Sequence, residues 1–65
     1  MKKTMCYILQ KRTWSDFDIE RLEPVLVSLD KDFILYQVMS KNTNLSPKEI
    51  KSEEKYVWTA VEFNA

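Results

Sequence analysis

The most restrictive feature of this chain is that none of its 65 residues is glycine. Average glycine usage would give about four or five in a chain of this length. Glycine supplies the positive φ angles of tight hairpins, helix C-caps and phosphate-binding loops. Walker and Rossmann phosphate loops, nucleophile elbows and glycine-clamped RNA motifs are therefore excluded. Tight turns must rely on Asn or Asp, and we expect them at residues 30–32 and 42–44.

The chain also lacks histidine and has a single cysteine, Cys6. Without histidine, Ser-His and Cys-His catalysis and most metal-hydrolase arrangements are impossible. Cys6 lies in an apolar segment, which favours a buried and unreactive thiol. One thiol forms neither an intrachain disulfide nor a cysteine-rich zinc site. A chain that has no intrachain disulfide is typical of a reducing compartment. We therefore predict a protein that is not an enzyme, with no catalytic residue, no metal and no cofactor.

Chain length and composition predict one small folded domain, residues 1–65, near the lower size limit for a self-sufficient core. Apolar residues make up 45% of the sequence and aromatic residues 12%, as in folding chains. Domains of this size usually add disulfides, a metal or oligomerisation. Since the first two are excluded, we expect a protein partner or a homo-oligomer.

The location expected from the sequence is the cytoplasm, without membrane contact. The apolar run after Lys2 and Lys3 has about five residues, whereas a signal peptide needs about 7–15. No stretch approaches the roughly 18 apolar residues of a membrane span.

Charge is balanced overall, with ten basic and ten acidic residues, but it is uneven along the chain. Residues 1–13 carry four basic and no acidic side chains, whereas residues 14–32 carry six acidic and two basic ones. A net charge of zero gives no general attraction to nucleic acid or to an anionic membrane. The basic N-terminal segment, with Tyr7 inside it, leaves nucleic-acid binding as a less favoured alternative.

The first half of the chain predicts a strand followed by a helix. Residues 5–10 form a short apolar run typical of a strand, one that could be buried on both faces. Thr13 or Ser15 is a suitable N-cap for a helix over about 16–29. The apolar residues of that helix share one face at spacings of three and four, namely Ile19, Leu22, Leu26 and Leu29. Pro24 should kink this helix or restart it.

The second half predicts two strands separated by a short helix. Residues 33–39 have the aromatic and β-branched content of a buried strand, although a helix continuing from Leu29 is also possible. Ser46, Pro47 and Glu49 form a capping box that begins a short helix. Residues 56–63 have strong strand propensity. The fold class expected is α+β, in the order β-α-β-(short α)-β, with a three-stranded sheet and one covering helix. The alternative is an all-α helical hairpin.

One segment resembles a known family. The sequences L-D-K-D-F-I at 29–34 and N-L-S-P-K-E-I at 44–50 are similar to the helical hairpin of SinI-type antirepressors. Proteins of that family pair with a helix-turn-helix repressor and disrupt its oligomer. The resemblance covers 22 residues and ends where Glu53 and Glu54 replace the apolar residues of the family's second helix. It implies a helix over 33–39 and a repressor as partner.

Two groups of side chains are the candidates for binding a partner. Tryptophan is frequent among interface residues that dominate binding, and the acidic segment suits a basic surface. The candidate residues are Trp14, Asp16, Asp18, Glu20, Glu23 and Trp58. The alternative is a purely structural role, with both tryptophans in the core and the acidic residues on a solvated helix face.

The function predicted is that of a small regulatory or inhibitory protein, of phage or accessory type, acting by stoichiometric binding to a larger protein or complex. A structural or homo-oligomeric subunit is the first alternative. A small nucleic-acid-binding protein that uses the basic N-terminal strand is the second.

Overall fold

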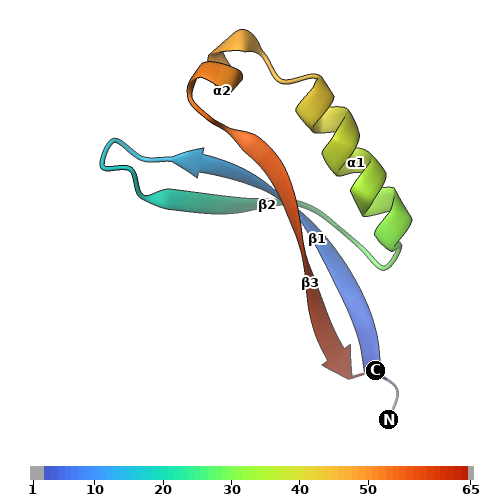
Figure 1. Cartoon of the computed structure of the whole chain (residues 1–65). Coiled ribbons are helices and arrows are strands. Elements are labelled where there is room, and N and C mark those ends of the chain that lie inside the picture. The colour runs from blue at the N-terminus through green and yellow to red at the C-terminus, as the bar shows by residue number, and fades with distance from the viewer. Residues whose placement is uncertain (1–2, 65) are drawn as a thin grey trace.

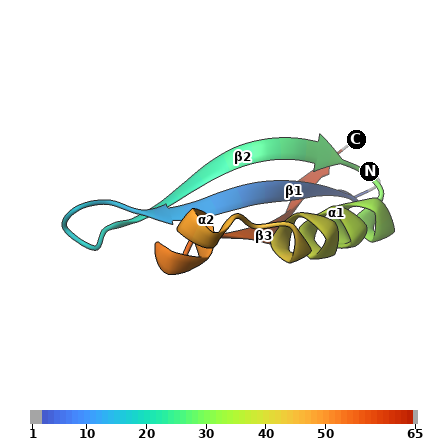
Figure 2. The same cartoon turned by 90° about the horizontal axis from the view of Figure 1, so that it is seen from above.

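The computed structural model describes residues 3–64, which form three strands and two helices. In chain order they are β1 (Lys3–Trp14), β2 (Glu20–Ser28), α1 (Lys31–Thr43), α2 (Pro47–Lys51) and β3 (Lys55–Asn64). The strands form one antiparallel sheet in the order β2-β1-β3. Helix α1 lies on one side of this sheet (Figure 1 and Figure 2). The predicted α+β class, with a three-stranded sheet and one covering helix, is confirmed, and the all-α alternative is wrong.

The predicted helix over 16–29 is wrong, because most of this segment is strand β2. It pairs with β1 from Tyr7 opposite Ser28 to Trp14 opposite Glu20. Pro24 explains the outcome: inside a helix its ring would clash with the preceding turn, whereas an edge strand tolerates its missing N–H. The pairing shifts register at Pro24, between Leu9 and Gln10 of β1.

The predicted strand over 33–39 is also wrong, and the alternative of a helix is correct. Residues 31–43 form α1, whose N-cap is Asp30. The Asp30 carboxylate accepts a hydrogen bond from the Phe33 backbone N–H at 3.2 Å, which satisfies one free donor of the first turn. The helix has apolar side chains on its outer side as well, with Tyr36 and Met39 exposed. This distribution is why the segment resembles a buried strand in sequence.

The other predicted elements are confirmed, although the first strand is longer than expected. Residues 5–10 lie in the middle of β1, residues 56–63 lie in β3, and α2 is a five-residue helix. Both hydrogen bonds of the capping box are present. The Glu49 N–H donates to Ser46 Oγ at 3.2 Å, and the Ser46 N–H donates to Glu49 Oε1 at 3.1 Å.

Among residues 3–64 of this chain without glycine, two take the left-handed backbone conformation: Asp18, with φ of 57°, and Glu53, with φ of 59°. Asp18 lies in the turn between β1 and β2, and Glu53 lies between α2 and β3. The segments 30–32 and 42–44, where turns were expected, are the two ends of α1 instead.

The core is small and lies between β1 and α1. Among the side chains whose burial the structure describes, Leu9 and Ile34 are the fully buried apolar ones, each with 0% exposure. By strand register, Tyr7, Leu26 and Trp58 share the face of Leu9. The sequence allowed residues 5–10 to be buried on both faces, but within the described residues only the face toward α1 is covered. Ile8 and its partner Val27 lie on the opposite face, where Val27 is 56% exposed.

The molecule is thin and elongated. Its principal extents are 45 × 26 × 11 Å, and its radius of gyration is 13.7 Å. A compact domain of this length has a radius of gyration of about 11 Å. Neither helix in the described part of the chain has the length and apolar character to cross a membrane.

Candidate functional site: the tip of the β1–β2 hairpin

The turn that joins β1 to β2, residues 15–19, is fixed by its own hydrogen bonds. The Ser15 N–H donates to the Ile19 carbonyl at 2.9 Å, and the Asp18 N–H donates to the Ser15 carbonyl at 3.0 Å. Ser15 Oγ accepts hydrogen bonds from the N–H groups of Phe17 at 3.3 Å and Ile19 at 3.1 Å. Ser15, expected as a helix cap, therefore organises a hairpin turn in the manner of a short polar side chain bonding to its local backbone.

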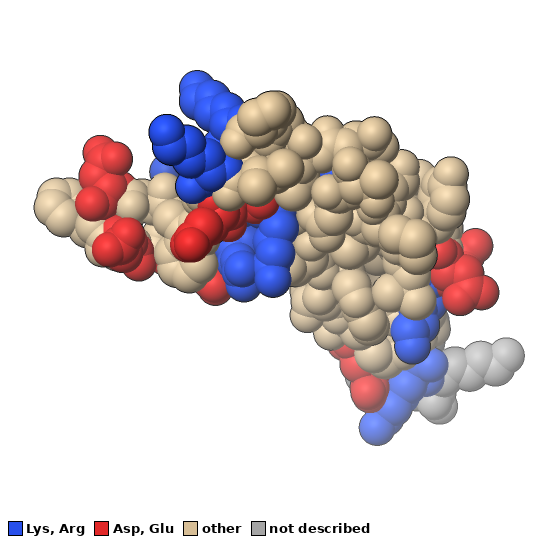
Figure 3. Space-filling view, turned by 45° about the horizontal axis from the view of Figure 1, so that its top comes forward, with Lys and Arg blue, Asp and Glu red and all other residues tan. Residues whose placement is uncertain are grey.

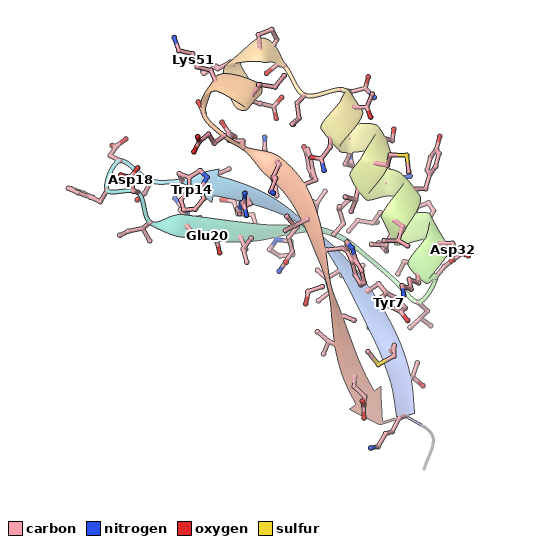
Figure 4. All side chains as sticks on the ribbon, viewed as in Figure 1. Tyr7, Trp14, Asp18, Glu20, Asp32 and Lys51 are labelled. Atoms are coloured by element: carbon pink, nitrogen blue, oxygen red, sulfur yellow. The ribbon has the colours of Figure 1, made fainter. Side chains whose placement is uncertain are left out.

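This turn exposes apolar side chains between acidic ones. Phe17 is 85% exposed, the highest value among the large apolar side chains of the described residues, and Ile19 is 60% exposed. Asp16 and Asp18 flank Phe17 in sequence, and both are exposed. We call residues 15–19 the hairpin tip. In Figure 4, Asp18 lies at the outer end of the hairpin, and Trp14 and Glu20 lie closer to the sheet.

Trp14 connects the base of the hairpin tip to the rest of the molecule. Its indole N–H donates to the Glu53 carbonyl at 3.3 Å. The Arg12 guanidinium lies 5.4 Å from the centre of the Trp14 ring, within the range of a cation–π contact. Arg12 Nη1 is also 3.9 Å from Glu20 Oε2. The Trp14–Glu53 hydrogen bond holds the hairpin against the segment that follows α2, and the two Arg12 contacts connect side chains within the base of the hairpin.

A groove of about 400 Å³ lies between the hairpin and α2. It is lined by Trp14, Asp18, Lys51, Ser52 and Glu53. The space-filling view shows acidic side chains toward the end of the hairpin and basic side chains over α2 (Figure 3). The groove therefore has the carboxylate of Asp18 on the hairpin side, and Lys51 and Glu53 on the helix side.

An ion cluster sets the position of α2 and thus of the groove wall. Lys11 Nζ is 2.9 Å from Glu49 Oε2 and 3.5 Å from Glu54 Oε1. The hydrogen bond from Lys11, together with those from the Ser46 backbone and side chain, lowers the pKa of Glu49 from 4.5 to about 2. The same Lys11–Glu49 hydrogen bond raises the pKa of Lys11. Each group favours the charged form of the other.

The structure brings four of the six predicted binding residues together. Trp14, Asp16, Asp18 and Glu20 lie within the hairpin tip or at its base, although the three acids were expected along one helix and Trp14 at its start. The hairpin unites them because the chain reverses direction between β1 and β2. Trp14 is 39% exposed, partway between the expected free and core states.

The other two predicted residues lie elsewhere. Glu23 is in β2, opposite Lys11 in the register, and its Oε1 is 3.8 Å from Arg21 Nη2. Trp58 is in β3, opposite Leu9, and its ring centre is 6.2 Å from that of Tyr7. Trp58 therefore packs beside the core, with 38% of its surface exposed.

Phe17 and Ile19 were not among the predicted binding residues. The prediction placed both in a helix, where Ile19 belonged to the buried face. The sequence does contain a signal for the turn: Ser15, Asp16 and Asp18 are turn-forming residues, and they lie between two segments rich in strand-forming residues.

The hairpin tip offers the chemistry of binding. Its exposed aromatic and aliphatic side chains fit an apolar pocket, and its carboxylates accept hydrogen bonds from basic groups. Within the described residues, no group of three or more His, Cys, Asp or Glu side chains is placed to hold a metal ion. Cys6 is a half-buried free thiol in β1 and does not line the groove.

Comparison with models of protein families, with curated proteins and with solved structures finds no match to this chain.

Proposed function

We propose that this protein is a small regulatory or inhibitory protein, without enzymatic activity, that binds a larger protein stoichiometrically through its hairpin tip. The observation that carries the proposal is the 85% exposure of Phe17 on a turn fixed by its own hydrogen bonds. Exposed aromatic side chains that enter a pocket dominate the binding energy of many interfaces. Because the turn is already ordered, binding loses little conformational entropy.

The chemistry of the tip defines the partner's surface. Phe17 and Ile19 require an apolar pocket, and burying Phe17 contributes on the order of 1.5–3 kcal/mol. Asp16 and Asp18 require lysine or arginine at the rim of that pocket. Such charges increase the association rate and the specificity more than the final affinity. The partner is therefore a protein with an apolar pocket inside a basic rim, and we place the interaction in the cytoplasm.

A helix-turn-helix repressor is one candidate for the larger protein. The segment that resembles SinI-type antirepressors, residues 29–50, spans α1, the following loop and most of α2. Repressors of this class have basic surfaces that contact DNA phosphates, so they also supply the basic rim that the hairpin tip requires.

The charge pairing of β1 argues against the nucleic-acid alternative. Lys3, Lys11 and Arg12 each form an ion pair with a glutamate, at 3.4, 2.9 and 3.9 Å respectively. A phosphate would have to compete with these carboxylates for each cation. Binding to nucleic acid depends mainly on basic side chains that are free to contact phosphates.

The test is quantitative capture from extracts of the native host, with Phe17→Ala compared against Tyr36→Ala. Tyr36 is an aromatic side chain of α1 with 65% exposure, so its loss removes a similar surface away from the tip. We expect the wild type and Tyr36→Ala to retain the same protein in a fixed molar ratio, and Phe17→Ala to lose it. Equal retention by all three would contradict the role of the tip, and the absence of any stoichiometric partner would contradict the function.

A further inference from the structure

The outer edge of β3 is covered at one end. Asn42 Nδ2 of α1 donates to the Tyr56 carbonyl at 2.9 Å, and the Tyr56 N–H donates to Asn42 Oδ1 at 2.7 Å. The backbone groups of Tyr56 therefore point away from β1. Because this direction alternates along an antiparallel strand, the N–H and C=O groups of Trp58, Ala60 and Glu62 also point outward.

These three residues form a free edge. Within residues 3–64, the outward backbone groups of Trp58, Ala60 and Glu62 have no hydrogen-bond partner. In Figure 1 the C-terminal half of β3 extends below the lower end of α1, and β1 lies beside it. Unpaired strand edges of this kind recruit another strand unless charge, proline or a bulge prevents it. Residues 57–61 contain no charged residue and no proline, and the charged member of the free edge is Glu62 at its end.

The opposite edge of the sheet, strand β2, is protected by a proline and by a shift in register. Pro24 lies in the middle of β2, and the ladder shifts register at the same position. Proline removes a donor, and a bulge bends the edge away from a straight partner. The sheet is thus closed to pairing along β2 and open along β3.

One end of the free edge, at Glu62, lies in a part of the sheet that has two strands, whereas Trp58 and Ala60 lie opposite β1 residues that also pair with β2. Strand β2 pairs with β1 only from Tyr7 onward, so residues 3–6 pair with β3 alone, opposite residues 61–64. We call residues 3–6 and 61–64 the two-stranded arm. Two strands without further packing are at best marginally stable in water.

The exposed area of the chain also indicates that part of its surface is available for an interface. The accessible surface is 5116 Å², whereas a folded monomer of this mass exposes about 4,400 Å². The excess of about 700 Å² approaches the roughly 800 Å² that each partner buries in a standard protein interface.

We propose that the protein forms a symmetric homodimer by antiparallel pairing of β3 with β3 of a second copy, which makes one six-stranded sheet. Since the backbone groups of Tyr56 are already hydrogen-bonded to Asn42, the pairing between the two β3 strands uses the backbone groups of Trp58, Ala60 and Glu62. The two-fold axis then passes beside Ala60, with Trp58 opposite the partner's Glu62. Lys31 Nζ lies 5.6 Å from the centre of the Trp58 ring, so this register brings a cation close to the partner's carboxylate.

The dimer is independent of the proposed function, because its edge lies apart from the hairpin tip. Pairing through β3 leaves both tips free, one on each copy. A failure of dimerisation would leave partner capture by Phe17 intact, and a failure of capture would leave the dimer intact.

The first experiment measures the mass in solution by sedimentation equilibrium. The protein concentrations run from about 10 to about 300 µM, which covers the dissociation constants of weak to moderate dimers. We expect twice the chain mass of 7.8 kDa for the wild type and a single chain mass for Ala60→Pro. This substitution removes an outward N–H and leaves the donors of the β1–β3 ladder in place. A wild type that is monomeric at all concentrations would overturn the proposal.

The second experiment tests the register by disulfide formation in a Cys6→Ser background. In the proposed dimer, the two Cα atoms at position 60 are about 5.5 Å apart, as in a hydrogen-bonded antiparallel pair. This distance suits a disulfide. We expect Ala60→Cys to cross-link quantitatively under mild oxidation. The matched control, Thr59→Cys, places its two thiols one residue further from the axis on the other face, and we expect no cross-link. Equal cross-linking of both variants, or of neither, would overturn the β3 pairing.

Discussion

Leu9 and Ile34 come from opposite layers of the fold, and both have 0% exposure. Because these two side chains form the centre of the core, the structure predicts a large cost for Ile34→Ala. The expected loss is about 2–5 kcal/mol, similar to the roughly 3–5 kcal/mol that a core of this size supplies. Urea unfolding followed by circular dichroism measures it. The control is Met39→Ala on the same helix, where the side chain is 68% exposed and the expected change is below about 0.5 kcal/mol.

The Asn42 side chain stabilises the end of the β3 edge. Its amide satisfies both backbone groups of Tyr56 in a partly buried position. We expect Asn42→Ala to lower the free energy of unfolding by about 1–3 kcal/mol, because the Tyr56 groups lose their partners. Asn44→Ala is the matched control, since Asn44 Nδ2 bonds the Ser40 carbonyl at an exposed position. Equal losses in the two urea titrations would contradict the role of Asn42 as a cover for the β3 edge.

At the scale of elements, the sequence predicted best what depends on neighbouring residues. The start of α2 was predictable because Ser46, Pro47 and Glu49 complete their capping interactions within one turn. Strand β2 was missed because its apolar spacing also fits a helix, and its actual pairing depends on a register with β1 that no local pattern reveals. The local signs against the helix were Pro24 and the turn-forming residues Ser15, Asp16 and Asp18.

The candidate site was partly predicted, for a related reason. Trp14, Asp16, Asp18 and Glu20 are close together in sequence, so any local structure keeps them near one another. Their functional geometry depends on the hairpin, which exposes Phe17 and turns it away from the core. Ile19, which the sequence placed on a buried helix face, is 60% exposed in the same turn. Trp58 lies apart from the others because its position is set by pairing with β1.

The attachment of α2 to the sheet predicts a dependence on acid. The pKa of Glu49 is lowered from 4.5 to about 2, first by the hydrogen bond from Lys11. A lowered folded-state pKa contributes stability that is fully present above the unfolded value and is lost as the pH falls through the folded value. We therefore expect the free energy of unfolding of the wild type to decrease between about pH 5 and pH 2. The decrease should be smaller in Glu49→Gln.

The measurement is urea unfolding at several pH values for the wild type, Glu49→Gln and Glu23→Gln. Glu23 is an exposed carboxylate of β2 that pairs with Arg21 at 3.8 Å, and its replacement leaves the Lys11–Glu49 contact in place. Glu23→Gln should retain the wild-type decrease. If Glu49→Gln retains it as well, the Lys11–Glu49 contact is not a source of the acid sensitivity.

At the scale of the whole molecule, the thin shape, the small core and the free β3 edge have a common consequence. A chain that completes its sheet with a second copy gains stability by mass action, because the dimer forms from folded chains and not from unfolded ones. The thermal midpoint of the wild type should therefore rise with protein concentration. For a domain of this length, each 1 kcal/mol of added stability raises the midpoint by about 4–8 °C.

Ala60→Pro provides the comparison, because it removes the outward donor at the proposed two-fold axis. Its thermal midpoint should be lower than that of the wild type at high concentration and should not change with dilution. The two midpoints should converge as the wild type is diluted below its dissociation constant, since both chains are then monomers with the same β1–β3 ladder. Parallel midpoints that never converge would show that the substitution weakens the monomer, and the β3 edge would then contribute nothing to assembly.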